Sequence, residues 1–563
     1  MIAFGSDLRS YAFARSKEFI LTAGGAYCSS SLAGNTRKYH GLLVAGRRVY
    51  LSALEEQVND RRISVARYKG ALLDEGLKFL NGFQLYPPRF YYMVDGTAVK
   101  KTVEFNGRLT IRYDVRGEAA FRLRPLVTDR SYHDVKNDVA MGQESFANGF
   151  KAGKLSMSSS LPFIEDKTIY RDIWYELDDE RGYSHSEDLY SPGYFQGTVE
   201  DGSILVNASA EGLDAIGVNN VMPSGPAGAL ECAADSFLVD DTIYAGYHWF
   251  AEPWGRDTFV SLPGLLLERG KFDEAKRVFR HFAVHIKDGL IPNRIPGGYN
   301  SSDAPLWFIY SLGKYFEKNK DPGFYKEARG YVENILSGYP DSEVATLDGA
   351  LISVQPETTW MDTRYTERKG KPVEINALWI NALKISGGMG LKLPVRPEAA
   401  LREFGRFWND KKGCLYDLLD PLDASVRPNQ IIAVALGAVD AEKARSTVDV
   451  VRKELLTPYG LRTLSANDSR YMGKFGGDAS YHNGCVWPWL MGFYLESLLR
   501  LGEPKDKTMQ LLEPLLLQTH DAGLGTISEI FDGDPPYRPN GCISQAWSVA
   551  EVLRANGMLN RQG

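Results

Sequence analysis

The sequence predicts a multidomain β + α protein, in which an N-terminal antiparallel β-sandwich over residues 1–225 is followed by an (α/α)6 barrel over residues 226–563. A chain of 563 residues is too long for one hydrophobic core, so two or more domains are expected. The first part carries short runs of β-branched and aromatic residues between turn signals. Beyond the turn-rich segment 219–228, the apolar residues recur at helical spacing.

The β part is predicted from its turns. Residues 41–52 form a hairpin pattern around Gly46. Asp95-Gly96 and Asn106-Gly107 separate three short β-type runs, and both dipeptides are strong hairpin turn signals. Residues 109–126 alternate between apolar and polar side chains, as in a strand with one buried face. Many short strands joined by such turns favour an antiparallel sandwich.

The second part predicts twelve helices, several of them joined by short turns. Twelve antiparallel helices suggest six helical hairpins that close into a barrel. A helical solenoid is the alternative, but no self-similarity at a fixed period of about 33–45 residues supports it. The predicted ranges are 230–240, 257–270, 273–288, 302–319, 322–338, 373–386, 396–409, 428–438, 440–456, 484–501, 506–520 and 542–556.

Composition excludes several classes of protein. The net charge of -6 argues against a nucleic-acid or anionic-membrane partner and favours a neutral or weakly charged ligand. No apolar run approaches the ~18 residues of a membrane span, and the N-terminal residues lack the apolar segment of a signal peptide. The five cysteines are scattered without a CxxC pair, which favours reduced thiols. We therefore expect a cytoplasmic location.

The segment from Thr359 to Asn376 is the one that most suggests chemistry. Trp360 lies two residues before Asp362, on a predicted loop that leads into a helix. A carboxyl group beside apolar surface is desolvated, which raises its pKa, and a proton donor to a leaving group needs such a pKa. The alternative is that Asp362 caps a turn and Trp360 packs in the core.

Tryptophans and polar residues alternate in the loops between the predicted helices. Nine of the ten tryptophans follow residue 245. Pyranose rings expose an apolar face and a rim of hydroxyls, so this combination suits a sugar. Packing in the core is the alternative for any single tryptophan. The candidate ligand contacts are Trp254, Arg256, Asp257, Asn293, Asp303, Trp360, Asn429, His482, Trp487 and Trp489.

A second acid candidate, Glu529, lies shortly before the last predicted helix. Two carboxylates on loops at one barrel mouth would make an acid–base pair for glycoside hydrolysis. Asp532 and Asp534 compete with it, but they lie in a Gly/Pro-rich turn, where bonds to their own backbone are favoured. Glu374 is the rival of Asp362. It lies in the first turn of a predicted helix, which lowers its pKa and favours a role as hydroxyl acceptor.

Other chemical motifs are weak. His281 and His285 are four residues apart on one predicted helical face, which is a spacing used for metal ligands. No third ligand follows nearby, and surface or core histidines show the same spacing. The sequence contains no P-loop, no GxGxxG after a strand and no GxSxG. It therefore predicts neither a metal nor another cofactor.

Several ordered blocks carry a resemblance to a known family. They are Gly34–Gly41, Trp254–Phe259, Gly289–Asn293, Trp360–Asp362, Val373–Ile375, Arg427–Asn429, Tyr481–His482, Ser528–Glu529 and Ser544–Trp547. Over nearly its whole length the chain resembles the amylo-α-1,6-glucosidase type of glycogen debranching enzyme, in its bacterial and archaeal form. The large eukaryotic enzymes also carry a glucanotransferase (β/α)8 barrel. The alternating pattern of such a barrel is not seen here, so the resemblance implies only the glucosidase half.

The resemblance implies a β-sandwich, an (α/α)6 barrel, an inverting mechanism and no cofactor. It implies Asp362 as general acid and Glu529 as general base. Arg256 and Asp257 are similar to the pair that holds outer hydroxyls of the terminal glucose in related glucoamylase-like barrels. The implied substrate is a branched α-glucan such as glycogen or a limit dextrin, from which α-1,6-linked glucosyl stubs are released as glucose. No oligomeric state is predicted.

Three alternatives to this function stay open. A glycoside phosphorylase would attack with phosphate, although an ionised Glu529 would repel that anion. Another glucoamylase-like exo-α-glucosidase would share the architecture. A non-catalytic glucan-binding protein would keep the ligand site without the chemistry.

Overall fold

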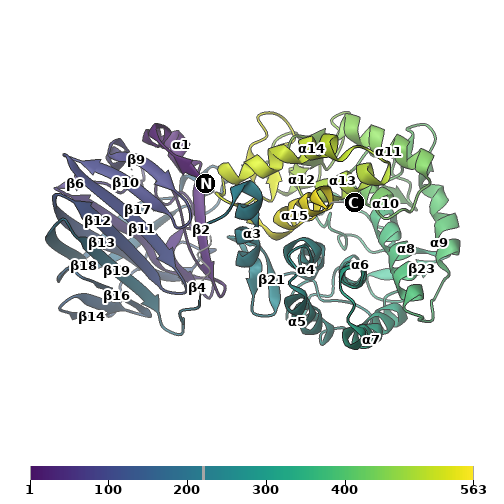
Figure 1. The fold of residues 1–563 in the computed structure, drawn as a ribbon, viewed down its shortest axis with the longest axis horizontal. Coiled ribbons are helices and arrows are strands. Elements are labelled where there is room, and N and C mark those ends of the chain that lie inside the picture. Colours follow the sequence, from purple (N-terminus) through teal and green to yellow (C-terminus); the bar gives the residue numbers. More distant parts are fainter. Residues whose placement is uncertain (1, 218–221, 562–563) are drawn as a thin grey trace. The chain divides into compact units, whose positions relative to one another are not determined.

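The computed structural model describes residues 2–217 and 222–561 and divides into two compact units (Figure 1). Unit 1 comprises Met1–Cys232 with Thr519–Gly525, and unit 2 comprises Ala233–Gln518 with Thr526–Gly563. Unit 1 is built mainly from antiparallel strands and unit 2 mainly from helices. Residues 219–221 of the predicted linker lie outside the described residues, and α3 (Gly225–Phe237) begins in its remainder.

Unit 1 contains two large antiparallel sheets. The nine-stranded sheet has, in spatial order, β1 (Ala3–Phe4), β9 (Leu80–Gln84), β10 (Arg89–Val94), β11 (Thr97–Phe105), β12 (Leu109–Arg116), β19 (Ser203–Ala210), β16 (Leu155–Ser159), β15 (Gly149–Ala152) and β14 (Gln143–Phe146). The ten-stranded sheet has β2 (Glu18–Ala23), β3 (Ala26–Ser31), β4 (Gly41–Ala45), β5 (Arg48–Val58), β13 (Glu118–Ser131), β18 (Ser186–Glu200), β17 (Phe163–Trp174), β7 (Ala66–Tyr68) and β8 (Ala71–Leu73), with β6 (Arg61–Arg62) beside β5.

The hairpins predicted at Gly46, Asp95-Gly96 and Asn106-Gly107 are confirmed, because each turn joins two paired strands. The alternating segment 109–126 is different. It is divided at Gly117, whose φ of 93° lies in the left-handed region that favours glycine. β12 and β13 on its two sides belong to different sheets. The period-two pattern continues through this crossover because both strands have one buried face.

The two sheets of unit 1 share one hydrophobic core. Buried side chains from the nine-stranded sheet, such as Val103 and Ile111, belong to the same apolar cluster as Leu51 and Leu123 of the ten-stranded sheet. Face-to-face packing of this kind explains why the inward positions of both sheets are apolar.

A helix lies in each of the twelve predicted ranges. After α3 these are α4 (Gly255–Leu262), α5 (Phe272–Ala283), α6 (Ala304–Lys318), α7 (Pro322–Gly338), α8 (Val373–Gly388), α9 (Pro397–Phe404), α10 (Gln430–Ala435), α11 (Ala441–Glu454), α13 (Leu490–Arg500), α14 (Lys505–Leu517) and α15 (Ala546–Asn560). Local signals account for several starts. Asp321 and Asp440 cap α7 and α11 by accepting backbone N–H bonds at 3.0 Å from Phe324 and Lys443.

Six helices of unit 2 form a closed ring. α4 packs on α6, α6 on α8, α8 on α10, α10 on α13, α13 on α15, and α15 on α4. Every residue of α4 is buried, whereas α5 and α11 bury only one face, so α4 lies inside the unit and the other two lie outside it (Figure 1). The close approach of α15 depends on Gly264, where a Cβ would lie 1.8 Å from the carbonyl oxygen of Ala550. An open solenoid would not bring the last helix back to the first.

Unit 2 also contains short strands and one short helix, α12 (Asp478–Tyr481), that the sequence patterns did not predict. The strands are β20 (Leu238–Val239), β21 (Thr242–Tyr247), β22 (Phe250–Pro253), β23 (Ala345–Asp348), β24 (Leu351–Val354), β25 (Lys371–Pro372), β26 (Trp408–Asn409), β27 (Cys414–Leu415), β28 (Leu418–Leu419), β29 (Leu456–Thr457), β30 (Gly460–Arg462), β31 (Val486–Trp487), β32 (Ile530–Phe531), β33 (Pro539–Asn540) and β34 (Ser544–Gln545). Most are too short for a period-two pattern to identify.

Cys28, Cys414 and Cys485 are buried free thiols, as expected for reduced cysteines. Within the described part of the chain, no helix has both the length and the apolar character that crossing a bilayer requires.

Candidate active site

The predicted site residues gather at the N-terminal ends of the inner helices of unit 2. The residues that precede the first turns of these helices are Trp254 for α4, Asp303 for α6, Pro372 for α8, Asn429 for α10, Trp489 for α13 and Gln545 for α15. The loops that enter the ring at this end carry the remaining candidates. Because helix N-termini carry a partial positive charge, carboxylates are favoured here.

Asp362 lies on the loop between β24 and β25, which we call the acid loop (residues 355–369). The loop is closed at its base by a bridge between Val354 and Gly370, with N–O distances of 2.7 and 3.1 Å. Gly370 has a φ of 119°, and a Cβ there would lie 2.3 Å from the carbonyl oxygen of Asp420. The base of the acid loop therefore requires glycine.

Arg256, near the start of α4, holds both Asp362 and the backbone of the acid loop. Its Nη1 donates to Oδ2 of Asp362 at 3.0 Å, and its Nη2 donates to the carbonyl oxygen of Thr359 at 2.8 Å. Its Nε donates to the carboxylate oxygens of Asp303 at 2.8 and 2.9 Å. One guanidinium thus joins α4, the start of α6 and the acid loop.

The carboxyl group of Asp362 is partly open. Its side chain is 40% exposed, yet protein surrounds it closely enough that burial raises its pKa, against the lowering effect of Arg256. The direction is the one expected from the apolar neighbour Trp360. A carboxyl group that is desolvated on one side and exposed on another can hold a proton and present it to a ligand.

Glu529 lies directly before β32 and is only 2% exposed. Its Oε2 accepts a bond from the backbone N–H of Cys542 at 2.8 Å, and its Oε1 accepts a short bond from the hydroxyl of Tyr481. Burial and the neighbouring Glu529 raise the pKa of Tyr481 well above its ordinary value, so the phenol stays a donor. These two donors fix the orientation of the Glu529 carboxyl.

Asp257 is a third carboxyl, and it connects the other two. Burial, together with the charges of Glu529 and Asp362, raises the pKa of Asp257 to about 7, against the attraction of Arg256. Contacts link Asp257 to both: it follows Arg256, which bonds Asp362, and its partner Gln545 donates a backbone N–H to the carbonyl oxygen of Ile527, two residues before Glu529. The side-chain amide of Gln545 donates to Oδ1 of Asp257 at 3.3 Å. The structure therefore brings Asp362, Asp257 and Glu529 together.

The predicted aromatic contacts form one packed cluster. The ring of Trp360 lies edge to face against those of His482, Trp487 and Trp489, with centroid distances of 5.4, 5.3 and 5.2 Å. None of the four side chains is more than 2% exposed. These rings cover one another's faces, which is the arrangement expected if they pack in the core. Through Trp360 the cluster supports the acid loop.

Several buried polar atoms around this cluster have no hydrogen-bond partner among the described residues. They are Nε1 of Trp254, Nε2 of His482, Nε1 of Trp489, Oε1 of Gln545 and Nε1 of Trp547. Burial lowers the pKa of His482 well below its ordinary value, so this ring is neutral. Buried polar groups are normally hydrogen-bonded, so these atoms mark a region in which an internal water or a bound molecule can supply the missing partners.

Sequence reasoning named Tyr481, Gln545 and Trp547 only as members of the blocks Tyr481–His482 and Ser544–Trp547 and gave none of the three a role in the site. Their position beside other predicted site residues in the sequence, before or at the start of a helix, was the signal available. Asn293 was predicted and is found here, because its Oδ1 accepts from the backbone N–H of Arg256 at 3.4 Å.

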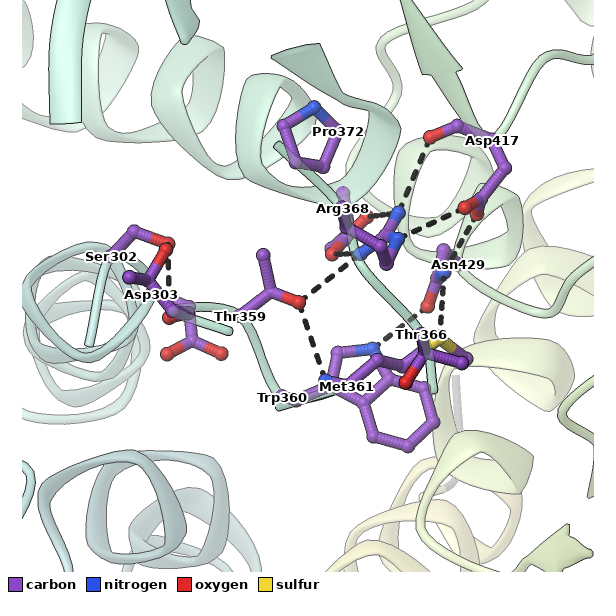
Figure 2. A network of polar contacts seen from close by, with 12 residues as sticks. Ser302, Asp303, Thr359, Trp360, Met361, Thr366, Arg368, Pro372, Asp417 and Asn429 are labelled. Carbon is purple, nitrogen blue, oxygen red and sulfur yellow. Dashed lines mark hydrogen bonds and ion pairs between the residues drawn. The ribbon is translucent and has the colours of Figure 1, made fainter. Parts of the chain in front are cut away.

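Asn429 is occupied by other side chains of the protein (Figure 2), and Glu374 is occupied by Arg368. Glu374 is 2% exposed and accepts two bonds from Arg368, one of them at 2.8 Å. Burial raises the pKa of Glu374, against the attraction of Arg368. This is the reverse of the direction that its place in the first helical turn suggested, because desolvation outweighs the helix terminus. Asn429 bonds to Trp360 and Asp417, each at 2.7 Å.

Asp532 and Asp534 act as structural acceptors, but not for their own turn. Oδ1 of Asp532 accepts from the backbone N–H of Phe475 at 2.9 Å and from the amide of Asn540 at 3.0 Å. Oδ1 of Asp534 accepts from the hydroxyl of Tyr471 at 2.8 Å. The expectation of purely local bonds was wrong, because the segment 471–475 folds back onto this turn.

His281 and His285 lie together, with ring centroids 5.8 Å apart. Within residues 2–217 and 222–561, neither belongs to a cluster of three or more potential metal ligands.

Comparison with known proteins gives a consistent result. A family model described as amylo-alpha-1,6-glucosidase matches residues 232–554, and one described as glycogen debranching enzyme N terminal matches residues 17–206. The glycogen debranching enzyme of Saccharomyces cerevisiae is 47% identical over 66 residues, which are 11% of this chain and only 4% of the yeast protein.

Two solved structures from Thermus thermophilus are similar over 59% of this chain, each at 12% identity. One is an uncharacterized conserved protein, covered over 100% of its length with a TM-score of 0.45. The other is a GH63 mannosylglycerate hydrolase in complex with glucose, covered over 100% of its length with a TM-score of 0.46.

Proposed function

We propose that this chain, which belongs to the amylo-alpha-1,6-glucosidase family, hydrolyses α-1,6-linked glucosyl stubs of glycogen or a related branched α-glucan with inversion and releases glucose. The coarser assignment, a glycoside hydrolase of the glycogen debranching family, follows from the two family matches. The specific reaction is supported mainly by one observation: Asp362, Glu529 and Asp257 lie close together, beside buried polar atoms that have no hydrogen-bond partner among the described residues.

The proposal includes the architecture and the location. The closed ring of inner helices supports an (α/α)6 barrel as the catalytic domain over residues 226–563. The common core of the two sheets supports a β-sandwich over residues 1–225. We keep the cytoplasmic location that the composition suggests.

In the proposed mechanism, Asp362 is the general acid. Its raised pKa favours the protonated form, which gives its proton to the oxygen of the 1,6 linkage as the bond to the anomeric carbon breaks. Arg256 lies 3.0 Å from the carboxyl and stabilises the carboxylate that is left after the transfer. The same arginine positions the acid loop through the carbonyl of Thr359.

Glu529 is the general base. Tyr481 and the backbone N–H of Cys542 hold its carboxylate, which removes a proton from the water that attacks the anomeric carbon from the opposite face. Asp257 and Gln545 supply hydrogen bonds to hydroxyls of the glucose ring. Holding the ring between acid and water converts an encounter of three partners into a reaction within one complex.

The test is incubation with a maltooligosaccharide that carries a single α-1,6-linked glucosyl branch, followed by product analysis. Free glucose and the linear chain are expected in buffer without phosphate. Release only after phosphate is added would identify a phosphorylase, and binding without any product would identify a glucan-binding protein. Release of glucose from unbranched maltooligosaccharides at equal rate would identify a general exo-α-glucosidase.

A further inference from the structure

A second buried guanidinium, that of Arg368, holds the acid loop (Figure 2). Arg368 is 3% exposed and lies on the same loop as Asp362. Its Nη1 donates to the hydroxyl of Thr359 at 3.3 Å. Thr359 is also the residue whose carbonyl oxygen accepts from Arg256. Both arginines therefore hold Thr359, Arg256 through its carbonyl oxygen and Arg368 through its hydroxyl, and Asp362 lies between Thr359 and Arg368 in the sequence.

Arg368 is itself fixed by two buried carboxylates. Glu374 accepts from Nη2 at 2.8 Å and also from Nη1, and Asp417 accepts from Nε at 2.9 Å. The carbonyl oxygen of Asp417 accepts a further bond from Nη2 at 3.2 Å. Both carboxylate side chains are only 2% exposed. A planar guanidinium with this many directed bonds has no freedom to move.

The contact with Asp417 continues to the residue beside the acid. Asp417 Oδ1 accepts from the side-chain nitrogen of Asn429 at 2.7 Å, and Asn429 Oδ1 accepts from the indole of Trp360 at 2.7 Å. The direction of this relay is unambiguous, because a carboxylate only accepts and an indole only donates. The amide of Asn429 can satisfy both partners in one orientation only.

We propose that Arg368, Asp417 and Asn429 form a positioning unit that holds Thr359 and Trp360 so that Asp362 stays against Arg256. None of the three is a catalytic residue, since each acts through another side chain. The inference rests on the proposed role of Asp362 as the acid. It adds a prediction that this role alone does not make. Removal of the Asp417 carboxylate, which is linked to Trp360 through Asn429, should change the position and the pKa of Asp362.

The consequence has a defined direction. Arg256 lowers the proton affinity of Asp362, because it favours the carboxylate. Burial outweighs this effect, because the net result is a raised pKa; if the acid loop loosens and water reaches the carboxyl, the pKa of Asp362 falls back toward its ordinary value and the proton is lost at lower pH. A misplaced acid also protonates the leaving oxygen less often, and a displacement of about 1 Å can cost about 10²-fold in rate. Ground-state binding of the glucan does not depend on the relay.

The experiment compares Asp417→Asn with the wild type. We expect kcat on the singly branched maltooligosaccharide to fall about 10²-fold, KM to change less than about threefold, and the basic limb of the kcat–pH profile to move to lower pH. The matched control is Glu551→Gln on α15, which also breaks a buried arginine–carboxylate pair, with Arg554, but is not connected to the acid loop. Its folded fraction should keep the wild-type kcat and pH profile.

A folded Asp417→Asn with wild-type kcat and an unmoved basic limb would overturn the proposal. So would a rise in KM at constant kcat, because that is the signature of a direct ligand contact. If this variant does not fold, Trp360→Phe removes only the indole donor at the end of the relay. It should show the same direction of pH shift with a smaller loss of kcat, and an unchanged profile would again overturn the proposal.

A third measurement separates this inference from the proposed function. The carboxyl carbon of Asp362 can be titrated by ¹³C NMR in the wild type and in Asp417→Asn, without substrate. If the wild type releases no glucose, the proposed function is wrong, yet a lower titration midpoint of Asp362 in the variant would still support the positioning unit. Equal midpoints would refute it even if the enzyme is active.

Discussion

Replacement of Asp257 by asparagine should change how the stability of unit 2 depends on pH. In the folded protein Asp257 keeps its proton up to a pKa of about 7, because it is buried beside the charges of Glu529 and Asp362. In the unfolded chain the same group loses its proton near its ordinary pKa of about 3.9. Between these values the folded state binds one more proton, so the free energy of unfolding falls as the pH rises.

The size of the effect follows from the shift. A gap of about three pH units, at about 1.36 kcal/mol per unit, amounts to about 4 kcal/mol, all of which is lost above the folded pKa. Between pH 5 and the folded pKa of about 7, the pH rises by about two units, and each unit removes about 1.36 kcal/mol. The wild type should therefore lose about 3 kcal/mol of stability relative to Asp257→Asn between pH 5 and pH 8. Asparagine resembles the protonated acid and has no proton to lose.

The assay is urea unfolding followed by tryptophan fluorescence at pH 5 and pH 8. Nine of the ten tryptophans follow residue 245, so the signal reports mainly on unit 2. Asp138→Asn, which changes an exposed aspartate, is the control and should show the wild-type pH dependence. A constant difference in stability between the wild type and Asp257→Asn across this pH range would refute the reasoning about a buried, protonated Asp257.

Four further outcomes are expected. Asp362→Asn and Glu529→Gln should each lower turnover by about 10²–10⁴-fold with sugar binding kept, and more than about a tenth of wild-type activity in either would contradict its role. The kcat–pH profile should be bell-shaped, with a basic limb that belongs to Asp362 and an acid limb that belongs to Glu529; an unchanged acid limb in the residual activity of Glu529→Gln would exclude that assignment. Proton NMR in the first minutes should detect β-glucose, and the carboxyl groups of Asp362 and Glu529 should be ~6.5–9.5 Å apart, whereas early α-glucose would indicate retention. Gly370→Ala should lower the thermal unfolding temperature and kcat together, because the Cβ meets the carbonyl oxygen of Asp420; an unaffected kcat would show that the base of the acid loop does not position the acid.

The sequence by itself determined the elements whose signals are local. Helix ranges follow from apolar periodicity and from caps such as Asp321 and Asp440, whose bonds reach only three residues along the chain. The hairpins follow from dipeptides such as Asp95-Gly96, because the turn conformation is decided within the turn. The direction of the pKa shift of Asp362 was also predictable, since its apolar neighbour Trp360 is two residues away.

The tertiary structure decided what depends on contacts between distant segments. Gln545 reaches Asp257 across 288 residues, and Asn429 reaches Trp360 across 69. The unusual pKa of Asp257 and the relay behind the acid loop follow from these contacts, which no local pattern encodes. Glu374 shows the reason most clearly. Its position in a first helical turn suggested a lowered pKa, but burial raises it, because desolvation depends on everything that packs around a group, wherever it lies in the sequence.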